Sequence, residues 1–199
     1  MKIFVITTPN DDLRASKLKT ELDNQIEIEK FDIQPWSAIM DYGSPHIGIS
    51  KTHRSIIQYA KDTDLSEVLI LEDDVHFLCR NSLVRFLNLN LVIPKDADMV
   101  FAGIYEGLLD KEASMYGRVL GRLSGLHAYI VKSKFYDKFL NVNPEFNLDY
   151  ALSTELSPVM YCANPFLIIQ RDNEWSYNLR GTSSHNYKLA ERYQLTNCE

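Results

Sequence analysis

The stretch from Glu67 to Phe77 constrains the fold of this chain more than any other. An uninterrupted apolar run, Val68 to Leu71, leads directly into three consecutive carboxylates, Glu72, Asp73 and Asp74. A short apolar run bounded by polar residues is typical of a strand that is covered on both faces, as in a parallel sheet. Unpaired buried carboxylates cost at least several kcal/mol, so the acids should lie where the strand leaves the sheet.

This acidic strand end has two interpretations. Open α/β sheets bind ligands at the carboxyl ends of their strands, and hard carboxylate oxygens there suit Mg²⁺ or Mn²⁺ bridging to a phosphate. Acids at a strand end are also commonly solvated, or they cap the following helix. For three acids taken alone the solvated interpretation is favoured, so the rest of the chain has to decide.

Hydrophobic patterns before this stretch predict a strand–helix–strand unit. Lys2 to Thr7 is apolar and β-branched, which indicates a buried strand. Asp11 or Asp12 can cap a helix that runs to about Leu22. Residues 26–31 alternate apolar and charged side chains and predict a half-buried strand. Such units open many nucleotide-binding folds.

The remaining elements follow from the same patterns. We expect a loop over 34–45, helices over 46–60, 80–89, 133–140 and 146–156, a mobile loop over 105–117, and strands over 67–72, 98–104, 118–123, 126–132, 159–162 and 166–170. The chain has no internal repeat and no linker that would justify a second domain. We therefore predict a single α/β domain over residues 1–199.

The composition disfavours several classes of protein. The 199 residues are 45% hydrophobic and 24% charged, which is ordinary for a globular domain. A net charge of −6 does not favour general binding to polyanions. No apolar run has the length of a signal peptide or a transmembrane helix. Cys79, Cys162 and Cys198 have no metal-ligand spacing, which fits a reducing compartment, so we expect a cytoplasmic protein.

Three further residues are able to carry chemistry, and each has a simpler interpretation. Asp149 could be a general base, but an acid early in a helix also favours the helix dipole. His185, in a polar tail, could be a third metal ligand, although a lone exposed histidine usually has no role. His53 lies on an amphipathic helix, where a histidine is usually structural.

The ordered motifs of the chain resemble family 25 glycosyltransferases, which include lipooligosaccharide and collagen galactosyltransferases. That family has an Ile-Gly-Cys start, a Ser-His pair, a helix, and a strand ending in Leu-Glu-Asp-Asp. The corresponding segments here are 47–53 and 68–75, with Ile49 in place of the Cys and Thr52 in place of the Ser. Further matches, in the same order, are Arg14, 126–131, 147–150 and 164–170. The resemblance covers most of residues 1–180, in a chain shorter than typical members.

The resemblance implies a GT-A type fold and a transferase. The fold would be a mixed α/β sheet, mostly parallel in an N-terminal nucleotide-binding half (about 1–110) flanked by helices, followed by an acceptor half and tail (about 111–199). The activity would be the transfer of a hexose from a UDP-sugar to a hydroxyl acceptor, with inversion and with Mn²⁺ or Mg²⁺ as cofactor. A departing diphosphate develops negative charge, which a divalent cation stabilises.

Roles for individual residues follow from the resemblance together with this ligand chemistry. Asp74 is expected to be a direct metal ligand, with Glu72 or Asp73 contacting the ribose or the metal. Asp149 is expected to be the base. His185 is a candidate third metal ligand, by analogy with tail histidines of GT-A enzymes. The remaining expected donor contacts are Thr7, Thr8, Arg14 and His53.

The acceptor stays open in the sequence. A surface glycan is the default, while a protein or a hydroxymethylated DNA base are alternatives. Five Lys and Arg residues over 118–138, against Asp137 alone, could touch nucleic-acid phosphates, but a solvated face fits the negative net charge better.

Two rival functions remain for the fold. A nucleotidyltransferase is disfavoured because the turn over residues 7–12 has no glycine and holds two acids. A non-catalytic sugar-binding module is disfavoured because the three strand-end acids, a candidate base and a tail histidine are all present.

Overall fold

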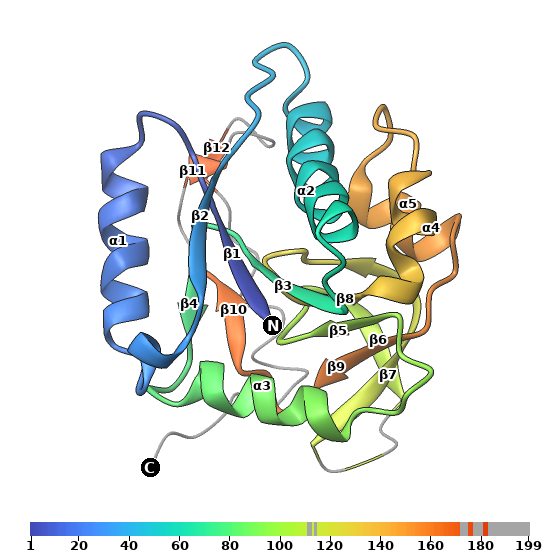
Figure 1. The fold of residues 1–199 in the computed structure, drawn as a ribbon. Coiled ribbons are helices and arrows are strands. Elements are labelled where there is room, and N and C mark those ends of the chain that lie inside the picture. The colour runs from blue at the N-terminus through green and yellow to red at the C-terminus, as the bar shows by residue number, and fades with distance from the viewer. Residues whose placement is uncertain (111–112, 114, 172–174, 177–180, 183–199) are drawn as a thin grey trace.

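A mixed eight-stranded sheet forms the centre of the molecule, and helices cover both of its faces (Figure 1). The computed structural model describes residues 1–110, 113, 115–171, 175–176 and 181–182. In their order across the sheet, the strands are β2 Ile33–Ser37, β1 Lys2–Thr7, β3 Glu67–Leu71, β8 Ala128–Lys132, β5 Met99–Phe101, β9 Met160–Ala163, β7 Tyr116–Ser124 and β6 Glu106–Asp110. The predicted α/β class is confirmed.

The register of the sheet brings several strand ends to one edge. β1 pairs in parallel with β2 and with β3, so the carboxyl ends of all three lie together. β8 runs antiparallel to β3, and its first residue, Ala128, is opposite Leu71. The segment that enters β8 therefore meets the acidic triplet that leaves β3. The three strands from the N-terminal part of the chain, β2, β1 and β3, are parallel to one another, as predicted.

Two layers of apolar side chains lie on opposite faces of the sheet. In β3, Val68 and Ile70 belong to one layer and Leu69 and Leu71 to the other, because successive side chains of a strand alternate. The first layer includes α2 Pro45–Asp62, α4 Tyr136–Leu140 and α5 Leu148–Thr154, and the second includes α1 Asp12–Asp23 and α3 Ser82–Val92. Burial on both faces explains the unbroken apolar run. No helix in the described part of the chain is both long and apolar enough to cross a bilayer.

The strand predicted over residues 26–31 is wrong. Glu27 has a left-handed backbone with a φ of 59°, and η1, a single 3₁₀ turn, covers Ile28–Lys30. The strand is β2, which begins at Ile33 and includes Pro35. β2 pairs only with β1, at the edge of the sheet, where a proline without an amide hydrogen is tolerated.

The mobile loop predicted over residues 105–117 is also wrong in most of its length. β6 and β7 form an antiparallel pair that extends the main sheet. Leu109 and Val119 pack against the first apolar layer, while Glu106 and Arg118 are exposed. The glycines and charges that suggested a loop belong to an edge hairpin with one solvated face.

Smaller elements complete the described chain. η2 Ser133–Phe135 precedes α4, β4 Val75–Phe77 pairs antiparallel with β10 Ile168–Gln170, and β11 Trp175–Ser176 pairs with β12 Gly181–Thr182. The β4–β10 pair matters for the site because it brings Gln170 beside the end of β3, although Gln170 and β3 are far apart in the sequence.

Candidate functional site

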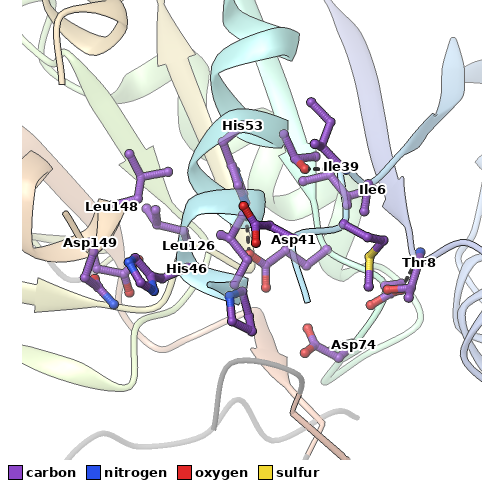
Figure 2. Close-up of a pocket in the computed structure, with 18 of the residues that line it drawn as sticks. Ile6, Thr8, Ile39, Asp41, His46, His53, Asp74, Leu126, Leu148 and Asp149 are labelled. Atoms are coloured by element: carbon purple, nitrogen blue, oxygen red, sulfur yellow. Dashed lines mark hydrogen bonds and ion pairs between the residues drawn. The ribbon is translucent and has the colours of Figure 1, made fainter. Parts of the chain in front are cut away.

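A cavity of about 520 Å³ lies at the edge where β1, β2 and β3 end. Its walls come from the turn after β1, the segment 38–46 after β2, the acidic triplet after β3, and the start of α5. Figure 2 shows Asp74 and Thr8 toward one end and Asp149 beside His46 toward the other. The expected site residues that line it are Thr8, Arg14, His53, Glu72, Asp73, Asp74 and Asp149.

Asp73 links the ends of β1 and β3. The backbone N–H of Thr8 donates to Asp73 Oδ2 at 2.9 Å, and Nη2 of Arg14 lies 3.1 Å from Oδ1. Burial raises the pKa of Asp73, while the Arg14 guanidinium opposes that rise. Arg14 is itself placed by the start of α1, where Asp11 accepts from its backbone N–H at 3.0 Å. Both Asp73 oxygens are thus occupied by protein donors.

Asp74 has one oxygen available. Its Oδ2 accepts from Arg14 Nη2 at 2.7 Å and from Gln170 Nε2 at 2.7 Å. Its Oδ1 is buried and has no hydrogen-bond partner among the described residues. A buried carboxylate oxygen without a donor is costly unless a ligand or an ion completes it. Asp74 is therefore the acid of the triplet best prepared to bind something in the cavity.

The Glu72 carboxylate is hydrogen-bonded to a buried histidine. Its Oε1 lies 3.1 Å from Nε2 of His53, whose Nδ1 lies 2.6 Å from the hydroxyl oxygen of Tyr129. Burial lowers the pKa of His53 to about 3, so this imidazole is neutral at physiological pH. Burial, and then the nearby Asp74, Asp149 and Asp73 charges, raise the pKa of Glu72 well above its usual value.

The segment 47–53 shapes the cavity through Gly48 and Thr52. A Cβ on Gly48 would stand 2.5 Å from the carbonyl oxygen of Ile39 and 2.9 Å from the backbone nitrogen of Asp41. Thr52 Oγ1 accepts from the backbone N–H of Ile39 at 2.8 Å and donates to the Gly48 carbonyl at 2.8 Å. Only a glycine lets the 39–41 backbone approach α2 this closely.

Gly48→Ala should therefore displace segment 39–41 from α2 and weaken ligand binding in the cavity. We expect a loss of unfolding free energy of about 1–3 kcal/mol, as for other overpacked contacts, measured by chemical denaturation. Gly43→Ala is the matched control, because a Cβ there meets only Asp41 Oδ1 at an ordinary 3.6 Å. Equal stability of the two variants would contradict the role given to Gly48.

Asp149 is positioned by two neighbouring segments. It lies in the first turn of α5, where Asn147 caps the helix by accepting from the Tyr150 N–H at 3.2 Å. The backbone N–H of Gly125, which has a φ of +119°, donates to Asp149 Oδ2 at 2.9 Å. Burial raises the pKa of Asp149 to about 6, although the Gly125 hydrogen bond and Arg122 act against it. A carboxylate with such a pKa is able to accept a proton near neutrality.

Two expected residues are not placed in the cavity. Thr7 is not among its lining residues, and its hydroxyl donates to the Trp36 carbonyl at 3.4 Å. His185 lies outside the described residues, so its proposed role as a metal ligand stays a prediction. Sequence reasoning gave no role to Tyr129 and Gln170, since only the pairing of β8 with β3 and of β10 with β4 brings them to the triplet. It also missed Asp41 and His46, which line the cavity.

The described residues contain no cluster of three or more His, Cys, Asp or Glu side chains arranged around a metal. Mg²⁺ and Mn²⁺ do not require one, because such ions are commonly held by one or two carboxylates, waters and substrate phosphates. Asp74, with its unpartnered Oδ1, fits that arrangement, and Glu72 fits it with the oxygen that His53 does not hold. Asp73 is less available for it, because each of its oxygens already faces a protein donor, and its contact with the ribose or the metal stays a prediction.

Comparison with known proteins identifies the fold. No protein-family model matches the sequence, and no curated protein is similar to it. Among solved structures, a glycosyltransferase involved in glycosylation of the major capsid of PBCV-1 matches with a TM-score of 0.55 and 12% identity, over 90% of this chain and 97% of that one. A197 from STIV matches with a TM-score of 0.52 and 14% identity, over 87% and 96%. Mannose-1-phosphate geranyltransferase from Thermus thermophilus matches with a TM-score of 0.51 and 8% identity, over 84% and 75%.

Identities this low establish a shared architecture and nothing finer, so membership of family 25 stays a prediction. Each of these matches spans at least 84% of this chain, so the likeness extends over most of the fold. The chain therefore has a GT-A-like α/β fold, similar to that of the glycosyltransferase involved in glycosylation of the PBCV-1 major capsid.

Proposed function

We propose that this protein is a metal-dependent glycosyltransferase that moves a hexose from a UDP-sugar to a hydroxyl acceptor, with inversion. The observation that carries the proposal is a single cavity with Asp74 toward one end and Asp149 toward the other. One end offers a buried carboxylate oxygen without a partner, and the other a carboxylate whose pKa is about 6. A cation site and a base on the same cavity are the two groups that such a transfer needs.

At the donor end, the chain's own residues bind and orient the diphosphate. Asp74, with Glu72, would hold Mn²⁺ or Mg²⁺, and the ion would supply positive charge for the leaving diphosphate. Arg14 adds a second positive charge, held at 2.7 Å from Asp74 and 12% exposed. Gln170 donates to the same Asp74 oxygen as Arg14, Oδ2, so the carboxylate is held while Oδ1 stays available.

At the acceptor end, Asp149 is proposed to take the proton from the attacking hydroxyl. Its Oδ2 is held by Gly125, so the carboxylate keeps one orientation. The hydroxyl oxygen attacks the anomeric carbon of the sugar while its proton passes to Asp149 and the bond to the diphosphate breaks on the opposite face. A single displacement of this kind inverts the anomeric carbon. This proposal also divides the chain into a donor half, about 1–110, and an acceptor half that supplies Asp149.

The proposal is tested by calorimetry with UDP and Mn²⁺ and by UDP release from a panel of UDP-sugars. We expect UDP to bind in the presence of Mn²⁺ and binding to weaken when the metal is chelated. A sugar-binding module would bind a UDP-sugar but release no UDP. Absence of UDP binding under every metal condition would sink the proposal.

The pH dependence of transfer should report on Asp149. A base works in its ionised form, so kcat/KM should rise with pH and level off above the pKa of about 6. A bound cation favours the ionised carboxylate and would move the midpoint lower. The measurement is the initial rate of UDP release across the acid-to-neutral range that brackets this pKa. A rate that falls as pH rises through the pKa would contradict a base at this position.

A nucleotidyltransferase is the second candidate, since its fold is related. The turn after β1 argues against it, because the Thr8 N–H is already donated to Asp73 and so is not available to a phosphate. We expect no pyrophosphate release from UTP and a hexose 1-phosphate. Pyrophosphate release at a rate exceeding UDP release would favour this candidate instead.

A glycan is the proposed acceptor, and a nucleic acid is not favoured. Two of the five basic residues over 118–138 are engaged by other groups of the protein. Lys132 pairs with Glu67 at 2.5 Å, and Lys134 donates to the carbonyls of Lys95 and Asp96. A protein or a hydroxymethylated DNA base are the other acceptors that a screen should contain. The cytoplasmic location stays a prediction.

A further inference from the structure

A chain of hydrogen-bonded side chains runs from the buried core to the acidic triplet. Tyr129 on β8 is fully buried, and its ring stacks on the rings of Phe101 and His53 with centroid distances of 5.8 Å each. Its hydroxyl oxygen lies 2.6 Å from His53 Nδ1, and His53 Nε2 lies 3.1 Å from Glu72 Oε1. His53 is only 1% exposed, and both ring nitrogens are engaged, so it has no polar atom left for a ligand.

We propose that His53 and Tyr129 are positioning residues that hold the Glu72 carboxylate toward the cavity, and that neither of them binds the donor. This inference rests on the proposed function, in which Glu72 contacts the ribose or the metal. It changes the role expected for His53, which the sequence had placed among the donor contacts. It adds Tyr129, which lies in the matching segment 126–131 but had been given no role.

The hydrogen bonds of this chain have only one direction that satisfies every group. If Tyr129 donates its O–H to Nδ1, then Nε2–H donates to the Glu72 carboxylate, and all three are paired. The reverse direction needs a protonated Glu72 and leaves the Tyr129 hydrogen buried without an acceptor among the described residues. An unmet buried donor is costly, so the first direction is favoured. Tyr129 thereby selects the His53 tautomer that serves Glu72.

Holding one oxygen of Glu72 has a direct consequence for binding. A free glutamate side chain has several rotatable bonds, whose freedom is lost when it contacts a ligand. Here His53 fixes Oε1 in advance, and the Glu72 side chain is still 25% exposed and lines the cavity. The second oxygen therefore faces a ligand without further ordering of the side chain. Such preorganisation increases affinity without adding a contact.

A double-mutant cycle tests the proposal. Tyr129→Phe removes only the hydroxyl, and we expect it to weaken UDP binding with Mn²⁺ about 5- to 10-fold, the size of one hydrogen bond. In a Glu72→Ala background, which leaves no side chain for His53 to hold, the same change should have almost no further effect, because Tyr129 acts through Glu72. Tyr136→Phe is the matched control, since that buried hydroxyl has no partner among the described residues. His53→Gln, which can still donate to Glu72, should bind UDP better than His53→Leu.

Two results would overturn the proposal: UDP affinity unchanged by Tyr129→Phe, or losses that simply add in the double variant. Nitrogen NMR of the histidines provides a readout that does not depend on UDP, with His53→Gln identifying the signal. We expect His53 to be protonated at Nε2, and the Nδ1 signal to shift in Tyr129→Phe, because that nitrogen loses its hydrogen-bond donor. Protonation at Nδ1 in the wild type would overturn the inference. If the wild type fails to bind UDP, the proposed function falls, while the NMR result still decides whether His53 is held in this way.

Discussion

Asp149→Asn should abolish sugar transfer while leaving UDP binding nearly unchanged. Loss of a general base typically lowers the rate about 10²- to 10⁴-fold. The asparagine oxygen can still accept from the Gly125 N–H, which now donates to Asp149 Oδ2 at 2.9 Å, so the local backbone should be retained. UDP release measures the first effect and calorimetry with UDP and Mn²⁺ the second. Transfer at a rate close to wild type would show that the base has been assigned wrongly.

The same variant should be more stable than the wild type, which separates lost chemistry from misfolding. Burial raises the pKa of Asp149 from 3.8 to about 6 in the folded state. Between these values the folded state binds more protons than the unfolded state, so ionisation lowers stability as pH rises. Above the folded-state pKa this ionisation costs about 3 kcal/mol of unfolding free energy. An asparagine has no charge, so the variant does not have this cost.

We therefore expect Asp149→Asn to raise the Tm by roughly 6–12 °C at a pH about two units above the folded-state pKa, with little difference from wild type near the unfolded-state pKa. Scanning calorimetry at both pH values measures this. Glu155→Gln, at the exposed end of the same helix, is the control and should change neither Tm nor transfer. A loss of Tm in Asp149→Asn at the higher pH would mean that the carboxylate stabilises the fold and is not held at a cost for function.

Asp74→Asn should remove the metal-dependent part of UDP binding. Even groups that only contact a metal ligand are worth about 10- to 100-fold in metal affinity, so loss of a direct ligand should cost at least this much. The variant keeps an oxygen for Arg14 and Gln170, which both donate to Asp74 Oδ2. UDP titrations with and without Mn²⁺ give the difference. Binding that stays equally metal-dependent would rule out Asp74 as a ligand.

Asp73→Asn provides the comparison within the triplet, because Asp73 has a different environment. Its two oxygens accept from the Thr8 N–H and lie near Arg14, so an asparagine NH₂ would face a donor on one side. We expect a loss of about 1–3 kcal/mol in unfolding free energy, measured by denaturation, as for a buried group left unpaired. Asp74→Asn should lower the unfolding free energy less than Asp73→Asn does. It should weaken metal binding more than Asp73→Asn does. The reverse pattern would exchange the two roles.

Much of the fold was predictable because local sequence patterns decide it. Strand β1, from Lys2 to Thr7, and the helix capped by Asp11 were predicted within a residue or two, since burial on both sheet faces and helix capping leave clear patterns. Strand β2 was misplaced because its alternation is interrupted by Pro35, which only an edge position permits. The β6–β7 hairpin was missed because its glycines and charges resemble those of a loop.

By itself, the sequence determined that three acids leave a buried strand and that a candidate base follows far along the chain. Only the tertiary structure decided how these acids differ, because their partners come from other strands and helices. Thr8 and Arg14 occupy Asp73, Gln170 of β10 helps to orient Asp74, and His53 of α2 holds Glu72. The sequence alone says which residues carry a carboxylate. Which of its oxygens stays available depends on which donors the fold brings within about 3 Å of it, the reach of a hydrogen bond.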